Sequence, residues 1–220
     1  MIITIDGPAA AGKGTVSKVL AERYHLAYFD TGMIYRAVGL EMVLAGFDLK
    51  DEDKAFEIAA HLTFEKMMRL STHPDFRSDV GGQAASKVSA MPKVRAALLK
   101  MQQDFALNPV FADGTKANGV IYDGRDTGTV VCPNADIKFF VTASSEVRAM
   151  RRFKEFEAKG VKTTYEKVLE DMLARDKRDS ERASAPMKPA DDAFIMDTSD
   201  MDAKAEIDAV LEVVEKKLKA

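Results

Sequence analysis

The first 24 residues place a strand-like segment, a glycine-rich segment and a helical pattern directly after one another. Residues 2–5 form a short β-branched run, which is the composition of a strand buried on both faces. Glycines follow at positions 7, 12 and 14, and apolar residues then recur at helical spacing at Val16, Val19 and Leu20. A strand that leads through a glycine loop into a helix predicts an α/β fold whose first loop can approach a ligand closely.

The glycine-rich segment, residues 7–15, has the composition of an anion-binding loop. Glycine lets the backbone turn so that several N–H groups point to one side, and the helix that starts near Gly12 adds the positive end of its dipole. Lys13 can then reach the outer phosphates of a nucleoside triphosphate. The alternative is a glycine-rich turn without a ligand, but the lysine and both flanking elements lie where phosphate binding needs them.

The loop departs from the general pattern G-x-x-x-x-G-K-[ST] at its last position. Gly14 occupies the place of the hydroxyl residue, and Thr15 supplies a hydroxyl one residue later. This GKGT variant resembles the loop of nucleoside monophosphate kinases. Without a hydroxyl beside Lys13, we expect Mg²⁺ to be held through water and the phosphates of the nucleotide, and Thr15 to contact an inner phosphate. No residue is assigned as a direct ligand of the metal.

Composition limits the classes of protein to which this chain can belong. The 220 residues, of which 46% are hydrophobic and 30% charged, can bury one good core and a smaller lobe. The formal net charge of −3 argues against a nucleic-acid partner, and no apolar run approaches the roughly 18 residues that span a bilayer. Cys132 is the single cysteine and is expected to be a small core residue; no signal or transit peptide is recognised. We therefore expect a cytoplasmic protein without a nucleic-acid or membrane partner. A monomer is also expected, but no feature of the sequence fixes the oligomeric state.

Predicted strands and helices alternate along the chain. Strands are predicted at 2–5, 27–29, 120–122, 137–142 and 193–197, with helical patterns between them. This order predicts an open, five-stranded parallel sheet with helices on both faces. The stretch 63–82 is predicted to be an inserted lobe in which pieces beside a turn at 72–75 pair as short strands. Thr163 and Glu166 are predicted to form the capping box of a later helix, and 106–118 a loop or small hairpin.

Arginine is concentrated in one part of the chain, because six of the twelve arginines lie between Arg148 and Arg182. In the last predicted helix of that part, an apolar stripe continues as Arg175, Asp179 and Arg182. We expect this face to turn inward toward an anion, although solvated surface arginines are the alternative. Further arginines come from three separate places: Arg36, Arg95 and Arg125. The distribution predicts two phosphorylated ligands that meet in an arginine-lined cleft.

The three histidines lie outside every motif, and no side chain is recognised as a general base. An alcohol that accepts a phosphoryl group would usually need a carboxylate nearby, whereas a phosphate acceptor is already ionised at neutral pH. The residues therefore favour phosphoryl transfer from a nucleoside triphosphate to a second nucleotide.

Six blocks of sequence carry a more specific resemblance. In chain order they are ITIDGPAAAGKGT, YFDTGMIYR, AASKVSAMPKVRAAL, YDGRDTGTVVCPNADIKFFVTAS, ARDKRDSERASAP and DDAFIMDTS. With these blocks the chain resembles bacterial-type cytidylate kinases, P-loop nucleoside monophosphate kinases that transfer a phosphoryl group from ATP to CMP or dCMP. The resemblance implies a P-loop kinase fold in a single domain over 1–220, with a core (1–44, 86–145 and 184–220), a CMP-binding insert at about 45–85 and a lid at about 146–183.

The resemblance also implies roles for individual residues. ATP would be bound by Gly7, Pro8, Ala9, Ala10, Ala11, Gly12, Lys13, Gly14 and Thr15. CMP would be bound by Asp30, Thr31, Tyr35, Arg36, Ser86, Arg95, Arg125, Asp126, Arg175, Asp179 and Arg182. Catalysis would depend on Lys13, Arg125, Arg151 and Arg182. Within the CMP set, cytosine would be read by Ser86, Arg95 and Asp126. The acceptor phosphate would be held by Arg36, Arg125 and Arg182, and the sugar hydroxyls by Arg175 and Asp179.

Three features depart from the family pattern. Ala9 and Ala10 replace a small hydroxyl residue and a glycine, so we expect a slightly stiffer loop. The stretch 63–82 is shorter than usual, and the loop at 107–119 is longer and has no assigned role.

Two alternative functions stay open: a P-loop kinase for another monophosphate such as UMP or for an alcohol, and a nucleotide-binding switch module. The lack of an N-K-x-D motif argues against the switch module.

Overall fold

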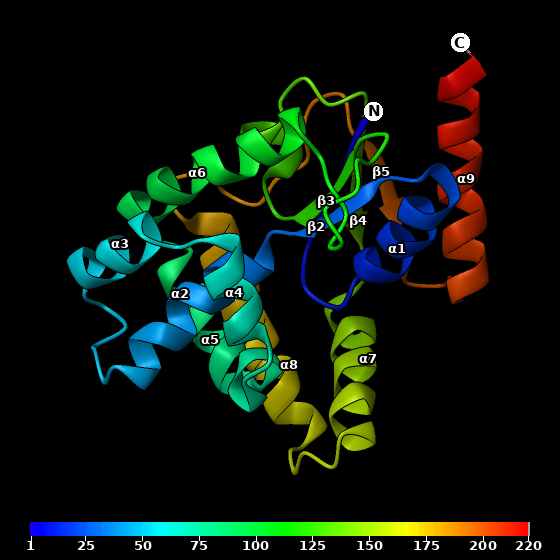
Figure 1. Ribbon diagram of the computed structural model, residues 1–220. Coiled ribbons are helices and arrows are strands. Elements are labelled where there is room, and N and C mark those ends of the chain that lie inside the picture. The colour runs from blue at the N-terminus through cyan, green and yellow to red at the C-terminus, as the bar shows by residue number, and fades with distance from the viewer. Residues whose placement is uncertain (220) are drawn as a thin grey trace. The chain divides into compact units, whose positions relative to one another are not determined.

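The computed structural model describes residues 1–219 (Figure 1). The described chain divides into two compact units. The first, which we call the sheet unit, comprises residues 1–29, 108–181 and 185 onward; the second, the helical unit, comprises residues 30–107 and 182–184. No helix over residues 1–219 has both the length and the apolar character needed to cross a membrane.

A five-stranded sheet forms the centre of the sheet unit. Its strands lie in the order β2 (Ala27–Asp30), β3 (Val120–Gly124), β1 (Ile2–Asp6), β4 (Ile137–Thr142) and β5 (Phe194–Asp197). The central strand β1 runs parallel to β3 and to β4, and β4 runs parallel to β5. The predicted five-stranded parallel sheet is confirmed. Because β1 is central, the loop that follows it starts in the middle of the sheet's carboxyl edge.

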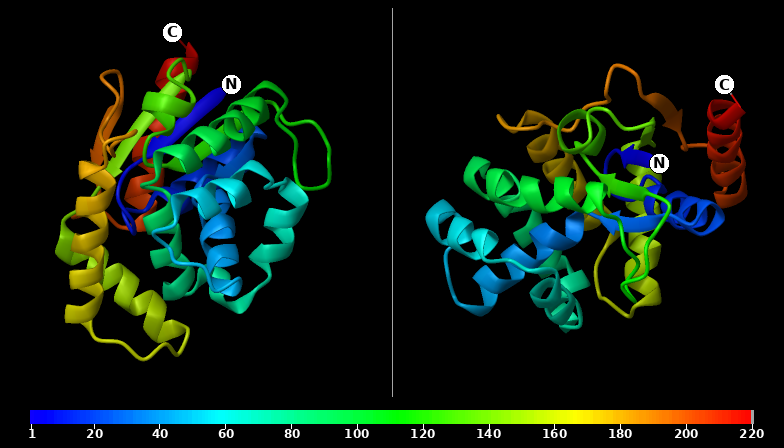
Figure 2. Two further views of the ribbon diagram at one scale, coloured as in Figure 1. Left: turned by 90° about the vertical axis from the view of Figure 1, so that its left-hand side faces the viewer. Right: turned by 45° about the horizontal axis from the view of Figure 1, so that its top comes forward.

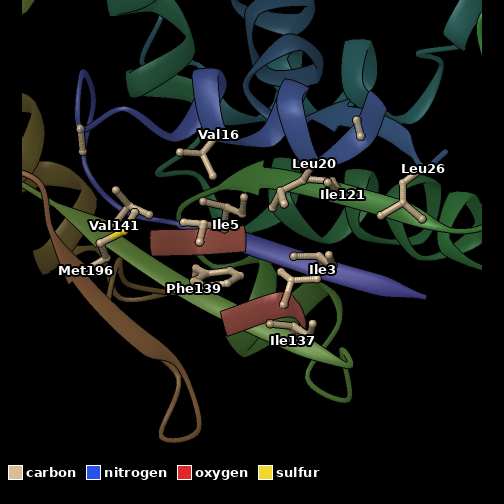
Figure 3. Packing of buried hydrophobic residues seen from close by; sticks show 14 residues of the cluster. Ile3, Ile5, Val16, Leu20, Leu26, Ile121, Ile137, Phe139, Val141 and Met196 are labelled. Carbon is tan, nitrogen blue, oxygen red and sulfur yellow. The ribbon is translucent and has the colours of Figure 1, made fainter. Parts of the chain in front are cut away.

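One face of the sheet is covered by the first and last helices, α1 (Lys13–Tyr24) and α9 (Ala203–Lys219). The cluster of buried side chains between them and the strands includes Ile3, Ile5, Val16, Leu20, Phe139, Val141 and Val210. In Figure 3, the side chains of Val16 and Leu20 on α1 face those of β1. Alternate strand positions and every third or fourth helix position therefore supply the core on which the glycine loop rests.

A second helix pair in the sheet unit packs against the glycine loop. α7 (Ser145–Ala158) and α8 (Tyr165–Glu181) are in contact, and their shared cluster consists of Ala149, Phe156, Val168 and Met172. Ala9 and Ala10 of the loop pack against this cluster. The apolar half of the predicted α8 stripe is thus buried, and α8 continues from this cluster toward its charged end.

The helical unit contains α2 (Gly32–Leu44), α3 (Glu52–Ala60), α4 (Phe64–Ser71), α5 (Asp79–Val88), α6 (Pro92–Leu107) and a short 3₁₀ helix at Pro74–Arg77. α2 packs on α3, α4 and α5, and α3 packs on α6. The prediction of short strands within 63–82 is therefore wrong. Thr63 Oγ1 accepts a hydrogen bond from Lys66 N at the start of α4, and His73 Nδ1 accepts one from Asp75 N at the start of the 3₁₀ helix. These caps stabilise two short helices on either side of the predicted turn.

Residues 108–119 form a small hairpin in the sheet unit, which Figure 2 shows as a long green loop. Val110 and Lys116 make an antiparallel bridge, and Phe111 N donates a hydrogen bond of 2.8 Å to Thr115 O. The ring of Phe111 lies 4.6 Å from that of His25, at the end of α1. The prediction of a loop or small hairpin is confirmed.

Cys132 is a buried, free thiol with 8% of its surface exposed. Its backbone N–H donates to Thr127 O at 2.7 Å, so the residue ends a π-helical turn at Thr127–Val131, which we call the η2 turn. Burial raises the pKa of the thiol to about 11, with a smaller contribution from Asp6. The expectation of a small core residue is confirmed.

The start of α8 differs by one residue from the prediction. Thr164, and not Thr163, caps the helix, because Thr164 Oγ1 accepts a hydrogen bond of 3.3 Å from Lys167 N. Thr163 and Glu166 have the spacing of a capping box, but two neighbouring threonines offer two possible helix starts. The spacing alone could not decide between them.

This cap gives a matched pair of variants. Thr164→Ala removes the capping acceptor and should lower the free energy of unfolding by ~1 kcal/mol, whereas Thr163→Ala should change it by less than about 0.5 kcal/mol. Chemical denaturation of both variants measures the difference. A larger loss for Thr163→Ala than for Thr164→Ala would contradict the observed helix start.

Candidate active site

The glycine loop, residues 7–15, turns sharply at the end of β1 and again before α1. Gly7 has φ 141°, and a Cβ added there would collide with the carbonyl oxygen of Val141, so only glycine fits. Gly12, at the N-cap of α1, has φ 97° and brings no side chain to cap the helix. The first turn of α1 contains no acidic residue. Its backbone N–H groups and dipole therefore favour an anion at this end of the helix.

Ala10 adopts φ 60°, the left-handed region that glycine enters more easily. At such a position alanine costs ~1 kcal/mol relative to glycine. Its side chain packs against the α7–α8 cluster, which offsets part of this cost. The departure from the family pattern at Ala9 and Ala10 therefore has a structural counterpart, because the two methyl groups join the loop to the helix pair.

Lys13 is buried, with 5% of its surface exposed, although it carries an ammonium group. Its Nζ donates a hydrogen bond of 2.9 Å to Pro8 O across the loop and lies 3.7 Å from Asp123 Oδ1 at the end of β3. Burial lowers the pKa of Lys13 to about 8, and the charge of Arg125 lowers it further while Asp123 opposes the shift. An ammonium so placed gains most from a multiply charged anion in the loop.

The end of β3 gathers the charged residues of the sheet unit. Asp123 Oδ2 accepts a hydrogen bond of 3.2 Å from the hydroxyl of Tyr28 on β2. Arg125 Nε donates to Asp179 Oδ2 at 3.2 Å, and Arg125 Nη1 donates to Gly124 O at 2.9 Å. Arg175 Nε lies 3.8 Å from the same oxygen of Asp179. The structure therefore places Arg125, Arg175 and Asp179 in one cluster, which joins two blocks that are far apart in the sequence.

Asp179 pairs with two arginines through one carboxylate oxygen. Its side chain is only 5% exposed, and its neighbours Arg125 and Arg175 are partly exposed at 16% and 24%. A single carboxylate between two guanidinium groups leaves one net positive charge in the cluster. Such an arrangement suits recognition of an anionic ligand that carries hydroxyl groups.

Arg151 contacts residues behind the glycine loop. It donates hydrogen bonds to Thr198 Oγ1 at 3.0 Å and to Thr198 O at 2.8 Å, and its Nη2 lies 3.0 Å from Glu206 Oε1. A Cβ added at Gly12 would collide with the Glu206 carboxylate, so this pair lies directly against the loop. Burial raises the pKa of Glu206, while Arg151 opposes the shift. In the described structure, Arg151 thus stabilises the loop from behind; its catalytic role stays a prediction.

Two further arginines of α7 also have partners. Arg148 is buried and joins three elements, because it donates to Ala143 O and to Ala9 O and lies 2.7 Å from Asp176 Oδ2. Arg152 Nη1 donates to Glu155 Oε2 on the surface of α7. Arg148 therefore fastens α7 and α8 to the glycine loop.

Of the remaining predicted CMP residues, Asp126 is buried in the sheet unit, directly after Arg125. The others lie in the helical unit: Asp30, Thr31, Tyr35, Arg36, Ser86, Arg95 and Arg182. Arg95 is buried, donates to Ser89 O at 3.1 Å and lies with its guanidinium carbon 5.4 Å from the centre of the Tyr35 ring. Arg36 Nη1 donates to Phe76 O at 2.9 Å, close to Gly82 of α5. Ser86 on α5 is 1% exposed, and Arg182 is 9% exposed.

Asp30 and Thr31 lie at the start of α2. Asp30 Oδ1 accepts a hydrogen bond of 2.9 Å from Gly32 N, whereas Thr31 holds the N-cap position without a side-chain cap. Aspartate and threonine can both cap a helix, and the side chain that accepts from the backbone here is that of Asp30. The helical unit therefore brings α2, α5 and the start of α6 together with their polar residues.

Asp6 is a site residue that sequence reasoning missed. It is the last residue of β1, 3% exposed, and its carboxylate accepts hydrogen bonds from Thr127 and Gly128 of the η2 turn. Burial raises its pKa to about 6, and the hydrogen bonds from Gly128 and Thr127 oppose the shift. The available signal was an acidic residue at the end of a buried strand, directly before the glycine loop.

Among residues 1–219, no group of three or more His, Cys, Asp or Glu side chains lies close enough to hold a metal ion. Asp6 is occupied by the η2 turn, and Asp123 lies between Tyr28 and Lys13. Both carboxylates are therefore already engaged by groups of the protein.

A central parallel strand, a glycine loop with a buried lysine and a helix N-terminus together define a P-loop protein of the α/β kinase class. Comparison with known proteins identifies the family within this class. The family model described as cytidylate kinase matches residues 3–216. The chain belongs to the cytidylate kinase family.

Individual relatives agree with the family match. The chain is 47% identical over 218 residues to a cytidylate kinase of Bradyrhizobium sp. (strain ORS 278), covering 98% of this chain and 96% of the relative. It is 50% identical over 213 residues to a cytidylate kinase of Paramagnetospirillum magneticum (strain AMB-1), covering 97% of each. An uncharacterised protein from Eubacterium ventriosum has a similar fold, with a TM-score of 0.51 at 15% identity and coverage of 98% of both chains.

The lowered pKa of Lys13 predicts how nucleotide affinity depends on pH. Above pH 8 the ammonium of the unliganded protein loses its proton, so binding of ATP must restore it. Affinity for ATP should fall by about tenfold from pH 7 to pH 9, with proton uptake on binding. Isothermal titration calorimetry in two buffers of different ionisation enthalpy measures both quantities. In Lys13→Arg, which stays charged, the dependence between pH 8 and pH 9 should disappear; an unchanged slope would contradict the assignment to Lys13.

Proposed function

We propose that this protein transfers the terminal phosphoryl group of ATP to CMP and dCMP, forming CDP and dCDP. The observation that carries the proposal is the buried Lys13 ammonium in the glycine loop at the start of α1, beside a cluster in which two arginines share one carboxylate. The first feature suits a triphosphate and the second suits a nucleoside monophosphate. Membership of the cytidylate kinase family supports the choice of substrates.

In this proposal, the residues of the glycine loop bind ATP. The N-terminus of α1 and Lys13 stabilise negative charge on the outer phosphates, and they do so more strongly as that charge spreads in the transition state. Mg²⁺ would neutralise the same phosphates and would be held by them and by water. The chain supplies no hydroxyl beside Lys13, because Gly14 stands there.

Each residue that the resemblance assigns to the acceptor is proposed to keep that role. Ser86, Arg95 and Asp126 are proposed to read cytosine, and Arg175 and Asp179 the sugar hydroxyls. The acceptor phosphate is proposed to contact Arg36, Arg125 and Arg182. The phosphate of CMP is ionised at neutral pH, so the chain needs to align the two nucleotides but does not need to remove a proton.

The domain organisation belongs to the same proposal. A single kinase domain would contain a CMP-binding insert at about 45–85 and a lid at about 146–183, both of which close when the two nucleotides bind. Closure would exclude water and so prevent loss of the phosphoryl group to hydrolysis. We propose a cytoplasmic monomer whose partners are ATP, CMP and dCMP.

A coupled assay tests the proposed substrates. With ATP and Mg²⁺, formation of ADP should be fastest with CMP and dCMP, slower with UMP, and no faster with AMP than with ATP alone. Chelation of Mg²⁺ should abolish the reaction. Equal rates with UMP or AMP would favour a kinase for another monophosphate, and slow ATP hydrolysis that no monophosphate changes would favour a nucleotide-binding switch.

Two substitutions test the proposed catalytic residues. Lys13→Ala and Arg182→Ala should each reduce kcat by two orders of magnitude or more, on the order of 3 kcal/mol of lost transition-state stabilisation. Lys18, which lies one helical turn and a half from Lys13 on the exposed side of α1, gives the control: Lys18→Ala should leave kcat unchanged. Steady-state kinetics and circular dichroism of the three variants separate loss of activity from loss of fold. Unchanged kcat in either of the first two would contradict the role of that residue.

A further inference from the structure

Asp6 is a buried carboxylate that the proposed transfer does not use. Side chains alternate along β1, so Thr4 and Asp6 lie on one face of the strand and Ile3 and Ile5 on the other. The Asp6 side chain contacts the η2 turn, which follows Asp126 directly in the chain. Asp6 therefore lies between two parts of the proposed site: the glycine loop that begins at residue 7 and the segment that carries Arg125 and Asp126.

Three hydrogen bonds join Asp6 to the η2 turn. Asp6 Oδ1 accepts from the backbone N–H of Thr127 at 2.8 Å and from its Oγ1 at 2.8 Å, and Asp6 Oδ2 accepts from Gly128 N at 2.7 Å. The first N–H groups of any helical turn lack partners within the turn. A carboxylate that binds two of them acts as a cap supplied from another strand, and its negative charge suits this end of the turn.

The ordinary cap residue does not fill this role. Asp126 holds the N-cap position of the η2 turn, but its side chain makes no capping hydrogen bond. If Asp126 capped the turn, its carboxylate would be engaged with the turn's own backbone. Because Asp6 caps the turn instead, the Asp126 side chain is not committed to that task.

The turn is also pressed closely onto β1. A Cβ added at Gly128 would come within 2.7 Å of Thr4 Oγ1 and 3.4 Å of Asp6 Oδ2, so the backbone must approach the strand here. After the C-terminal end of the turn, Lys138 Nζ donates to Pro133 O and to Asp192 Oδ1, and these bonds fix the chain there. Loss of the Asp6 contacts would therefore release the start of the turn, which Arg125 and Asp126 directly precede.

We propose that Asp6 is a positioning residue, which fixes Arg125 and Asp126 for the acceptor nucleotide by capping the η2 turn from the strand that leads into the ATP loop. The inference rests on the proposed function, because Arg125 and Asp126 are assigned there to the acceptor. One side chain thus connects the donor side of the site to the acceptor side within the sheet unit.

The test uses Asp6→Asn, which keeps the size of the side chain but offers an N–H₂ group where an acceptor is needed. Loss of a hydrogen bond to a charged group should raise KM for CMP about tenfold or more and lower kcat, while Kd for ATP measured without CMP changes by less than about threefold. A general loosening of the fold would weaken both nucleotides alike. Unchanged KM for CMP, or equal losses for ATP and CMP, would overturn the proposal.

Two variants of the turn keep the test decisive should Asp6→Asn not fold. Thr127→Val keeps the shape of a buried side chain but removes its hydrogen bond to Asp6, and should raise KM for CMP about threefold; Thr127→Ser keeps the hydroxyl and should restore it. Failure of Thr127→Ser to differ from Thr127→Val would count against the capping contact.

Thr4 gives a matched control on the same strand and face. Its Oγ1 is buried and makes no hydrogen bond within the described residues, so Thr4→Val should leave KM for CMP and kcat unchanged. A loss in Thr4→Val equal to that in Thr127→Val would show a packing effect and overturn the proposal.

A readout without CMP separates this inference from the proposed function. Hydrogen exchange of the Thr127 and Gly128 amides should be faster in Asp6→Asn than in wild type and unchanged in Thr4→Val. If wild type did not phosphorylate CMP but these amides lost protection, the proposed function would fail and the cap would stand. Unchanged protection in Asp6→Asn would overturn the cap, whatever the substrate.

Discussion

The burial of one ammonium group dominates the energetics of this site. Lys13 has little access to water, and a buried cation is costly unless anions or dipoles surround it. In the described structure Pro8 O and Asp123 give it partial compensation, and its lowered pKa shows that the compensation is incomplete. The loop is therefore kept in a state that a polyphosphate can improve. A multiply charged anion in the loop would complete this compensation.

Charge pairing also occurs on the elements around the glycine loop. Arg125 and Arg175 share Asp179, Arg148 is paired with Asp176, and Arg151 is paired with Glu206. In these sets each guanidinium has a carboxylate that orients it, which limits the number of rotamers available before a ligand arrives. Because the carboxylates come from α8 and α9, these helices determine where Arg125, directly after β3, and the two arginines of α7 point. The paired arginines of this chain therefore also hold its helices and loops together.

Local patterns predicted the parts of the structure that depend on local chemistry. The five strands follow from β-branched and apolar runs, and the loop from Gly7, Gly12 and Lys13 at fixed spacing. The start of α8 at Thr164 and the helices within 63–82 were mispredicted, because competing caps and short segments leave several options of nearly equal energy. Partners distant in sequence could not be found this way: Asp6 and Thr127 are 121 residues apart, and only the packing of the turn on β1 joins them. The roles of the CMP residues came from resemblance to a family, since no spacing within one chain distinguishes a base-reading arginine from a phosphate-binding one.

The location of the single thiol has a practical consequence. Cys132 ends the η2 turn, is buried, and has a pKa well above that of an exposed cysteine. Reaction with an alkylating reagent requires both exposure and deprotonation, so the folded protein should react only through transient opening of this turn. Cys132 can therefore serve as a natural chemical probe of the segment that contains Arg125 and Asp126. The rate of alkylation of Cys132 would report how often the η2 turn opens transiently, and the measurement would need no engineered label.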